Sequence, residues 1–297
     1  TISPPLNMAQ FAALKQEIDD QIRQAMQQYA SPMELYYDVS LVKDGGQITA
    51  VALDGTAVGL VDHNTSTVYY VELATKKAAV VGGGNAFSGV SSVGMHGETL
   101  YALASGGIHA VSVEEKKTTE RVVKKSDEWG TIISLVSFGG NLYLLDTTKS
   151  RIWKYVAVDK KESTGKPGFS DIREYLNPDT LPDLSRATGM AIDGSVWMGT
   201  TDGKVLRFTQ GKENPILVQG VEPKLSQSLY VYTNDTLKYL YVLEAKAKRV
   251  VVLDKDGLYL SQYTWEDDIL PSVMVVSEQE KKILLLAGGK LYGITLR

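Results

Sequence analysis

The sequence contains no cysteine, only three histidines and no excess of positive charge. The lack of cysteine excludes thiol nucleophiles, thiolate zinc sites, iron–sulfur clusters and disulfides. His63, His96 and His109 supply little material for metal or acid–base sites. With 31 basic against 35 acidic residues, the chain lacks the electrostatic signature of a nucleic-acid-binding protein. No run of residues approaches the roughly 20 consecutive apolar side chains that a membrane-spanning helix needs.

The 297 residues are 43% hydrophobic and 22% charged, which suffices for a full globular core. Residues 6–29 have the pattern of an amphipathic helix, with Asn7 and Gln10 as a capping pair and Ser31-Pro32 as its expected end. Its apolar positions are Met8, Phe11, Leu14, Ile18, Ile22, Ala25 and Tyr29. Two interpretations remain open, because such a helix either packs on its own domain or continues an upstream stalk.

After Pro32 the helical period disappears, and short runs of Val, Ile, Leu and Tyr alternate with polar turns. A two-strand unit recurs, most clearly at residues 139–155, 193–208 and 238–253. Its anchor positions are Gly59, Tyr101, Tyr143, Trp197, Tyr241 and Leu284. They follow one another at intervals of roughly 40 to 45 residues, the spacing of propeller blades. The one longer interval contains residues 160–186, which we interpret as a loop insertion.

Six copies predict an all-β, six-bladed β-propeller of four-stranded antiparallel blades, preceded by the N-terminal amphipathic α-helix. The expected division is residues 1–31 for the helix and 32–297 for the propeller. The last blade reaches Arg297 after its third strand, so it lacks an outer strand. We expect residues 34–42 to supply that strand and to close the ring, since radial folds leave only short, protected edges.

No catalytic motif of a known kind is present, and no catalytic residue, metal site or cofactor is predicted. An axial metal would need several inward carboxylate, Asn or His side chains, whereas the predicted inner strands are mostly apolar or Ser/Thr. Asp62, Asp146 and Glu244 each end the second strand of a blade. We interpret these three acids as caps of the following turn rather than as ligand contacts.

The connections from outer to inner strands should gather on one face of a propeller. Two tryptophans fall in polar connections of this kind, and Trp and Arg are common anchors of binding surfaces. The candidate ligand-binding residues are Glu128, Trp129, Arg186, Trp265 and Asp267. The alternative for both tryptophans is that they fill the gaps between neighbouring blades, and the sequence leaves the two interpretations open.

Residues 146–152 and 244–257 resemble the NHL-type propeller repeat, in which an acidic residue, a polar turn and Arg-Ile or Arg-Val precede a strand. Residues 127–130, 139–155 and 190–208 look like the C-terminal propeller of membrane-anchored proteins with a PPM-type phosphatase domain from uncultivated, small-genome bacteria. The resemblance implies an external propeller on a helical stalk, tethered by an upstream transmembrane helix. This chain contains no phosphatase residues, so the resemblance does not imply phosphatase activity for it.

We therefore expect a non-catalytic binding or sensing module, located outside the cytoplasm, whose ligand is a protein, a peptide or a glycan. Nucleic acid is not an expected partner, and membrane contact is expected only through a segment upstream of this chain. A helix that exposes Phe11, Ile18 and Ile22 would favour self-association. The alternatives are a propeller enzyme of lactonase, lyase or glycosidase type, with its site at the channel mouth, and a structural spacer at the cell surface.

Overall fold

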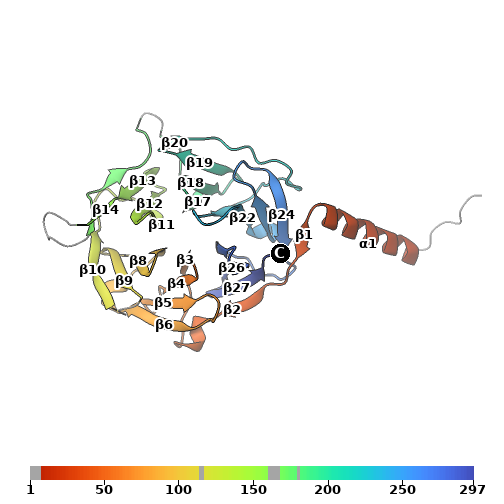
Figure 1. Ribbon diagram of the computed structural model, residues 1–297. Helices are drawn as coiled ribbons and strands as arrows, with labels where there is room; N and C mark the ends of the chain where they lie inside the picture. Colours follow the sequence, from red (N-terminus) through yellow and green to blue (C-terminus); the bar gives the residue numbers. More distant parts are fainter. Residues whose placement is uncertain (1–7, 114–116, 160–167, 179–180) are drawn as a thin grey trace, which may run out of the picture.

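The computed structural model describes residues 8–113, 117–159, 168–178 and 181–297, without the side chains of residues 9, 19 and 117–120. Six blades of four antiparallel strands each are arranged around a central axis (Figure 1), and the sheet of blade 5 has one further strand. Within each blade the strands are ordered from the axis to the perimeter. The predicted six-bladed β-propeller with an N-terminal helix is confirmed.

The blades are numbered in chain order, and each is listed from its inner to its outer strand. Blade 1 consists of β3 (Ala50–Asp54), β4 (Ala57–Asp62), β5 (Thr67–Glu72) and β6 (Ala78–Gly83). Blade 2 consists of β7 (Ser92–His96), β8 (Thr99–Ala104), β9 (Gly107–Ser112) and β10 (Lys117–Lys124). Blade 3 consists of β11 (Ile132–Phe138), β12 (Asn141–Asp146), β13 (Arg151–Tyr155) and β16 (Arg173–Glu174).

The second half of the ring follows the same plan. Blade 4 consists of β17 (Ala187–Ile192), β18 (Ser195–Thr200), β19 (Val205–Thr209) and β20 (Lys212–Glu213). Blade 5 consists of β21 (Tyr230–Tyr232), β22 (Leu240–Glu244), β23 (Arg249–Leu253) and β24 (Tyr259–Thr264). Blade 6 consists of β25 (Val273–Ser277), β26 (Lys282–Ala287), β27 (Lys290–Thr295) and β2 (Glu34–Tyr37).

The second and third strands of each blade are apolar on both faces because each blade is packed between two neighbours. Six hydrophobic clusters follow, one in each gap between adjacent blades. The repeat anchors Tyr143, Trp197 and Tyr241 are buried in these gaps. Gly59 occupies the same position in blade 1, where a Cβ would lie 2.5 Å from Leu100 Cδ1 of blade 2. Glycine there lets the Leu100 side chain fill the space that an aromatic ring fills elsewhere.

The outer strand of blade 6 comes from the other end of the chain. Strand β2 pairs antiparallel with β27, with Glu34 opposite Gly293 and Leu35 opposite Tyr292. Within residues 34–42 the strand ends at Tyr37 and is followed by a 3-10 helix, Val39–Leu41. Asp38 caps this helix by accepting a hydrogen bond from the Ser40 amide at 2.9 Å. The two ends of the propeller are thus joined in one sheet.

The long interval in the repeat contains more than a loop. A two-stranded ladder, β14 (Ala157–Val158) with β15 (Gly168–Phe169), lies between β13 and the outer strand β16. Phe169 is buried in the cluster between blades 2 and 3. The interpretation of this region as a loop insertion was therefore incomplete, because the segment also provides the outer strand and a core side chain.

The N-terminal helix α1, Met8–Ala25, is shorter than its apolar period suggests. The backbone turns at Gln27, which has a φ of 47°, and Gln28–Ala30 then form β1, a fifth strand parallel to β24 on blade 5. The expected end at Ser31-Pro32 is therefore wrong, because pairing with the edge of β24 overrides the helical period. The proposed cap residue Asn7 lies outside the described residues.

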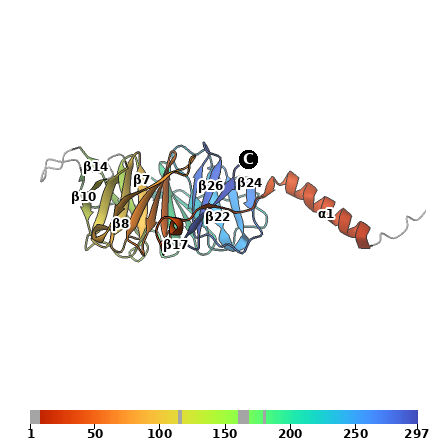
Figure 2. The same ribbon diagram turned by 90° about the horizontal axis from the view of Figure 1, so that it is seen from below.

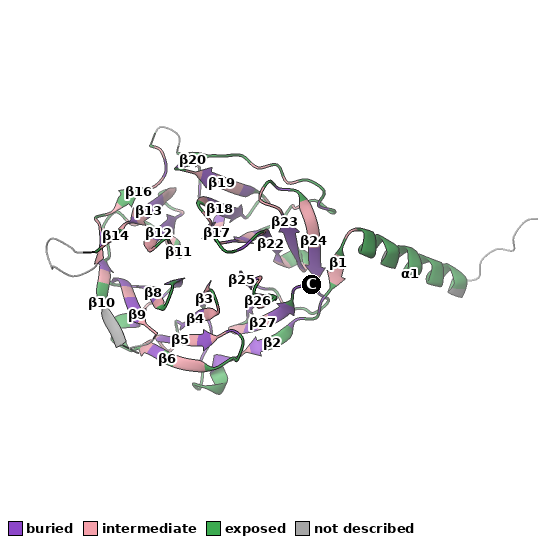
Figure 3. Cartoon of the chain, viewed as in Figure 1, coloured by how far each residue is buried: buried purple, intermediate pink, exposed green. Residues whose placement is uncertain are grey.

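Helix α1 projects from the perimeter of blade 5 and does not pack on the propeller (Figures 1 and 2). Its apolar stripe is exposed, with 86% of Met8, 59% of Phe11 and 53% of Ile22 accessible to solvent. Figure 3 shows the helix as an exposed element beside the buried interior of the blades. In the part of the chain that the structure describes, no helix is long and apolar enough to cross a membrane.

Candidate functional site

Strand direction assigns every connection to one of two faces. Because the four strands of a blade alternate in direction, the outer-to-inner connections and the turns between second and third strands lie on one side, which we call the connection face. The described parts of the outer-to-inner connections are residues 38–49, 84–91, 125–131, 175–178 with 181–186, 214–229 and 265–272. The other side, the turn face, carries the turns that join the first strand to the second and the third to the fourth.

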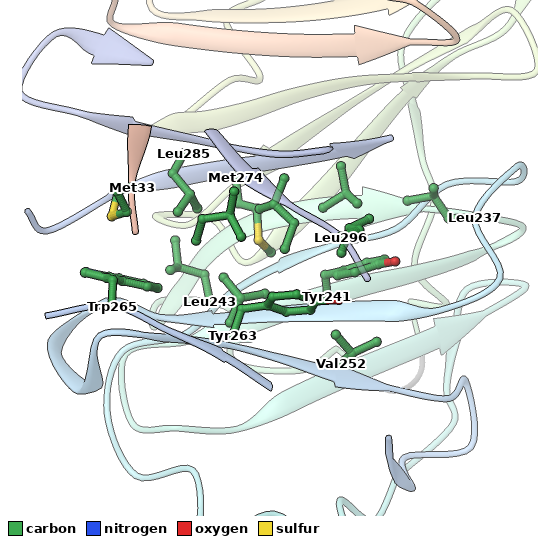
Figure 4. Packing of buried hydrophobic residues seen from close by; sticks show 14 residues of the cluster. Met33, Leu237, Tyr241, Leu243, Val252, Tyr263, Trp265, Met274, Leu285 and Leu296 are labelled. Atoms are coloured by element: carbon green, nitrogen blue, oxygen red, sulfur yellow. The ribbon is translucent and has the colours of Figure 1, made fainter. Parts of the chain in front are cut away.

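Trp265 is only 5% exposed and lies in the cluster between blades 5 and 6. Its indole Nε1 donates a hydrogen bond to the Ile269 carbonyl at 3.1 Å. In Figure 4 the indole lies among the core side chains, on the side of the cluster near Met33. The expectation of an exposed aromatic anchor at position 265 is therefore wrong, and the gap-filling alternative holds there.

Trp129 is partly buried and packs at the gap between blades 2 and 3. Its indole Nε1 donates to the Tyr155 hydroxyl at 2.9 Å, and the two rings meet edge to face with centroids 6.2 Å apart. Burial raises the pKa of Tyr155 to about 12, and the hydrogen bond from Trp129 partly offsets this rise. Trp129 thus contributes to packing between blades and keeps only part of its ring at the surface.

The two tryptophans belong to a wider pattern, because each outer-to-inner connection inserts apolar side chains between two blades. The buried members in the other four connections include Val39, Phe87, Leu176 and Val221. Phe87 follows the outer strand of blade 1 much as Trp129 follows that of blade 2. An alignment of these connections against one another would have indicated the packing role from the sequence.

The three charged candidates are exposed but belong to three different connections. Glu128 lies beside Trp129, and its backbone amide donates to Ser126 Oγ at 3.1 Å. Arg186 pairs with Asp202 at 3.3 Å, an exposed contact of little energetic weight. Asp267 is in the connection from blade 5 to blade 6. The fold places all three on the connection face without gathering them at one point.

Asp62 and Asp146 have the capping role expected for them, whereas the Glu244 side chain makes no cap hydrogen bond to the turn that follows it and pairs instead with Arg249. Asp146 Oδ2 accepts hydrogen bonds from the Gly130 amide at 2.6 Å and from Trp153 Nε1 at 3.0 Å. Its Oδ1 accepts from the Lys149 amide in the next turn at 3.0 Å. Asp62 makes similar contacts with the amides of Gln47 and Thr65. Asp62 and Asp146 therefore each tie the preceding connection of their own blade to the turn that they cap.

A cavity of about 330 Å³ runs along the axis and is lined by the inner strands of all six blades. Most of its hydroxyl groups are used within the protein. Thr49 Oγ1 donates to the Val61 carbonyl at 3.2 Å, Ser137 Oγ donates to the Asn141 carbonyl at 3.2 Å, and Ser92 Oγ accepts from the Leu135 amide at 2.9 Å. These contacts hold neighbouring strands together, so the Ser/Thr content of the inner strands is largely structural.

Two tyrosines of β21 also line the axial cavity. The Tyr230 ring lies against Gly189 of blade 4, where a Cβ would come within 2.6 Å of Cε2 of that ring. Burial raises the pKa of Tyr230 to about 12, and it raises that of Tyr232 further. Tyr232 reaches the Leu53 carbonyl of blade 1 at 3.5 Å. Both phenols are neutral hydrogen-bond donors at physiological pH.

The turn-face end of the cavity carries the ionisable groups. Asp54, His96 and Asp235 line this end, and Asp54 Oδ2 accepts a hydrogen bond from the Gly97 amide at 2.6 Å. Among the described residues, no three or more His, Asp or Glu side chains are grouped closely enough to hold a metal ion.

The connection face also exposes several large apolar side chains. Leu41 is 84% exposed, and Val42 and Leu270 are more than half exposed. All three lie in the two connections that flank blade 6. Ile133 is 37% exposed where β11 begins, at the rim of the axial cavity. This surface mixes apolar side chains with the charged residues predicted for it.

Comparisons with known proteins agree with the fold. No protein-family model and no curated protein matches the chain. Among solved structures, a streptogramin B lyase superimposes with a TM-score of 0.58 at 9% identity, covering 90% of this chain and 97% of that one. Virginiamycin B lyase from Staphylococcus aureus gives 0.55 at 11% identity, covering 90% and 89%. A chain of a nidogen/laminin complex gives 0.52 at 12% identity, covering 73% and 80%. At these identities the similarity establishes the propeller architecture.

Proposed function

We propose that this protein is a non-catalytic binding or sensing module whose ligand, a protein, a peptide or a glycan, contacts the connection face. The observation that carries the proposal is the exposure of Leu41, Val42 and Leu270 in neighbouring connections. Large apolar side chains exposed within a polar surface are compatible with an interaction site, and contiguous patches of them are typical of one. The charged residues Glu128, Arg186 and Asp267 lie on the same face and would contribute specificity.

The test combines a printed glycan array with selection of a random peptide library on the immobilised full chain. Ligands enriched on the wild type should lose their enrichment on a Leu41→Ser, Leu270→Ser double variant. The matched control is Val80→Ser, because Val80 is 52% exposed on the outer strand of blade 1, away from the connection face. Equal loss of binding by the control would refute the assignment of the site to the connection face. An absence of any enriched ligand would refute the binding function and favour the alternative of a structural spacer at the cell surface.

We further infer that the propeller acts outside the cytoplasm and is tethered to a bacterial membrane in the full-length protein. The resemblance to NHL-type repeats and to phosphatase-domain membrane proteins is part of this inference. Helix α1 supports it, because it projects from the perimeter as a stalk would. Its exposed stripe also supports self-association of two chains through the helix. A protease added to intact producing cells should release the propeller if the location is correct.

A propeller enzyme with its site at the channel mouth is the second candidate, favoured by the presence of His96, Asp54 and Asp235 at one end of the axial cavity. The test is turnover of a γ-lactone, of a cyclic ester antibiotic and of a nitrophenyl glycoside. Activity that falls at least about 100-fold in His96→Ala, a loss in the range of general acid–base catalysis, would establish this candidate. Unchanged activity in that variant would refute it.

A further inference from the structure

A second groove, separate from the axial cavity and from the connection face, lies on the turn-face side between blades 5 and 6. It encloses about 560 Å³ beside strand β1 and the end of the chain at Arg297. Five of the 16 tyrosines of the protein line it, namely Tyr29, Tyr239, Tyr241, Tyr259 and Tyr263. Such a concentration of aromatic side chains is typical of binding pockets.

The tyrosines have two roles in this groove. Tyr241 and Tyr263 are each 2% exposed and form its floor as part of the core. Tyr29, Tyr239 and Tyr259 are partly exposed and form its walls. The Tyr259 hydroxyl donates to the Met26 carbonyl at 2.6 Å, which fixes this ring to the end of helix α1. The Tyr259 wall therefore has a defined position before any ligand binds.

The polar groups around the rim are mostly hydrogen-bond donors with no partner of their own. Within the described part of the chain, the side chains of Gln27, Ser261 and Lys281 form no hydrogen bond or ion pair. The Arg297 guanidinium lies over the Tyr29 ring at 5.2 Å, which positions a second cation at the edge of the groove. All four side chains can donate hydrogen bonds to oxygen atoms of a ligand.

Among the described residues that line the groove, Glu278 has the one side-chain carboxylate, and the protein already uses it. Glu278 Oε1 accepts from the amides of Lys238 and Tyr239 at 3.1 and 3.2 Å and from the Tyr241 hydroxyl at 3.1 Å. Its Oε2 accepts from the Lys238 amide at 3.0 Å. Its charge and hydrogen bond raise the pKa of Tyr241, in addition to the larger effect of burial. Lys281 and Arg297 thus remain as the charged side chains available to a ligand, and both are positive.

We propose that this groove binds an acidic oligosaccharide. Sugar rings present apolar C–H faces that pack on tyrosine rings, their hydroxyls suit Gln27 and Ser261, and carboxylates of uronic acid units suit Lys281 and Arg297. The groove and the connection face are on different parts of the molecule, so failure of this proposal leaves the proposed function untouched.

The test is isothermal titration of the full chain with trigalacturonate, with its fully methyl-esterified form and with triglutamate. Trigalacturonate should bind saturably, more weakly as salt rises because the contacts are charged, and at least about 10-fold more tightly than the neutral ester. Lys281→Gln and Arg297→Gln should each lower the affinity by about 10-fold.

The matched control is Lys76→Gln, because Lys76 lies over the Tyr36 ring at 4.7 Å as Arg297 lies over Tyr29, but at the edge between blades 6 and 1. This variant should bind trigalacturonate as the wild type does. Tyr239→Leu keeps an apolar side chain and removes the flat ring, so it should weaken binding without a change in Tm. Absence of saturable binding, equal binding of the ester, preference for triglutamate, or equal loss in the control would each overturn the proposal.

Discussion

The buried ion pair of blade 5 offers the most direct test of how the long connection, residues 214–229, is fixed. The Arg249 guanidinium contacts Glu244 Oε2 through Nε at 2.8 Å and through Nη2 at 2.6 Å, and the two side chains are 4% and 1% exposed. Glu244 Oε1 accepts from the amides of Ser226 and Gln227. Arg249 also donates to the carbonyls of residues 222 and 223 and to the Gln262 side chain. If either the Glu244 or the Arg249 side chain is removed, the buried polar groups that it contacts lose a hydrogen-bond partner.

Removing one partner leaves an unpaired charge in the core, which typically costs about 3–5 kcal/mol. Against a total stability of about 5–15 kcal/mol this is a large loss. For a chain of this size roughly 2 °C of Tm is lost per kcal/mol, so Glu244→Ala should melt about 6–10 °C below the wild type. Urea unfolding monitored by tryptophan fluorescence gives the free energy of unfolding, and calorimetry gives the Tm.

The controls separate burial of charge from the loss of any ion pair. Asp268→Ala removes the exposed pair with Lys248, which is 2.7 Å long, and should leave the Tm unchanged. The double variant Glu244→Leu, Arg249→Met should be more stable than Glu244→Ala, since no charge remains buried. A cost below about 1 kcal/mol for Glu244→Ala, or a double variant no more stable than Glu244→Ala, would refute the reasoning.

Three further predictions concern Trp265, His109 and the exposed face of helix α1. Trp265→Ala should lower the free energy of unfolding in urea by about 3–5 kcal/mol because it empties the gap between two blades. If the variant is as stable as the wild type but no longer binds ligand, Trp265 is a ligand contact after all. Burial and the Arg121 charge lower the pKa of His109, so its stabilising contribution is complete above about pH 6.5 and is lost as the pH falls through the lowered value. Between pH 7.5 and pH 5 the Tm of His109→Gln should therefore fall less than the Tm of the wild type. An equal fall in the two proteins would contradict this. Ile18→Glu should abolish any dimer seen in sedimentation equilibrium, whereas Gln24→Glu, on the opposite face of the helix, should not.

The repeat could be predicted from the sequence because blade packing is periodic along the chain. The second strand of each blade is buried on both sides, so Tyr143, Trp197 and Tyr241 recur as large, buried aromatic residues at the spacing of one blade. The role of Asp146 as a cap also followed from local pattern, since a carboxylate at a strand end accepts amides within a few residues. Closure by β2 could be anticipated because the last blade lacked one strand.

The candidate sites could be predicted only in part because they depend on which blades and segments become neighbours. Trp265 follows a strand in a polar stretch of sequence, and its burial is decided by Met33 and by blade 6, which are distant in the sequence. The end of helix α1 at Ala25 was decided by the free edge of β24. The tyrosine groove combines β1, blade 5 and the end of blade 6, so no local signal could reveal it.

The sequence by itself therefore determined the number of blades, their strand pattern and the caps that Asp62 and Asp146 form, because these rest on contacts within about 45 residues, one blade repeat. Only the tertiary structure decided which aromatic side chains fill gaps and which remain accessible. Trp265 is buried, whereas Tyr29, Tyr239 and Tyr259 line an open groove. The physical reason is that the exposure of a side chain depends on surface covered by distant segments, and residue type and local period do not specify those neighbours.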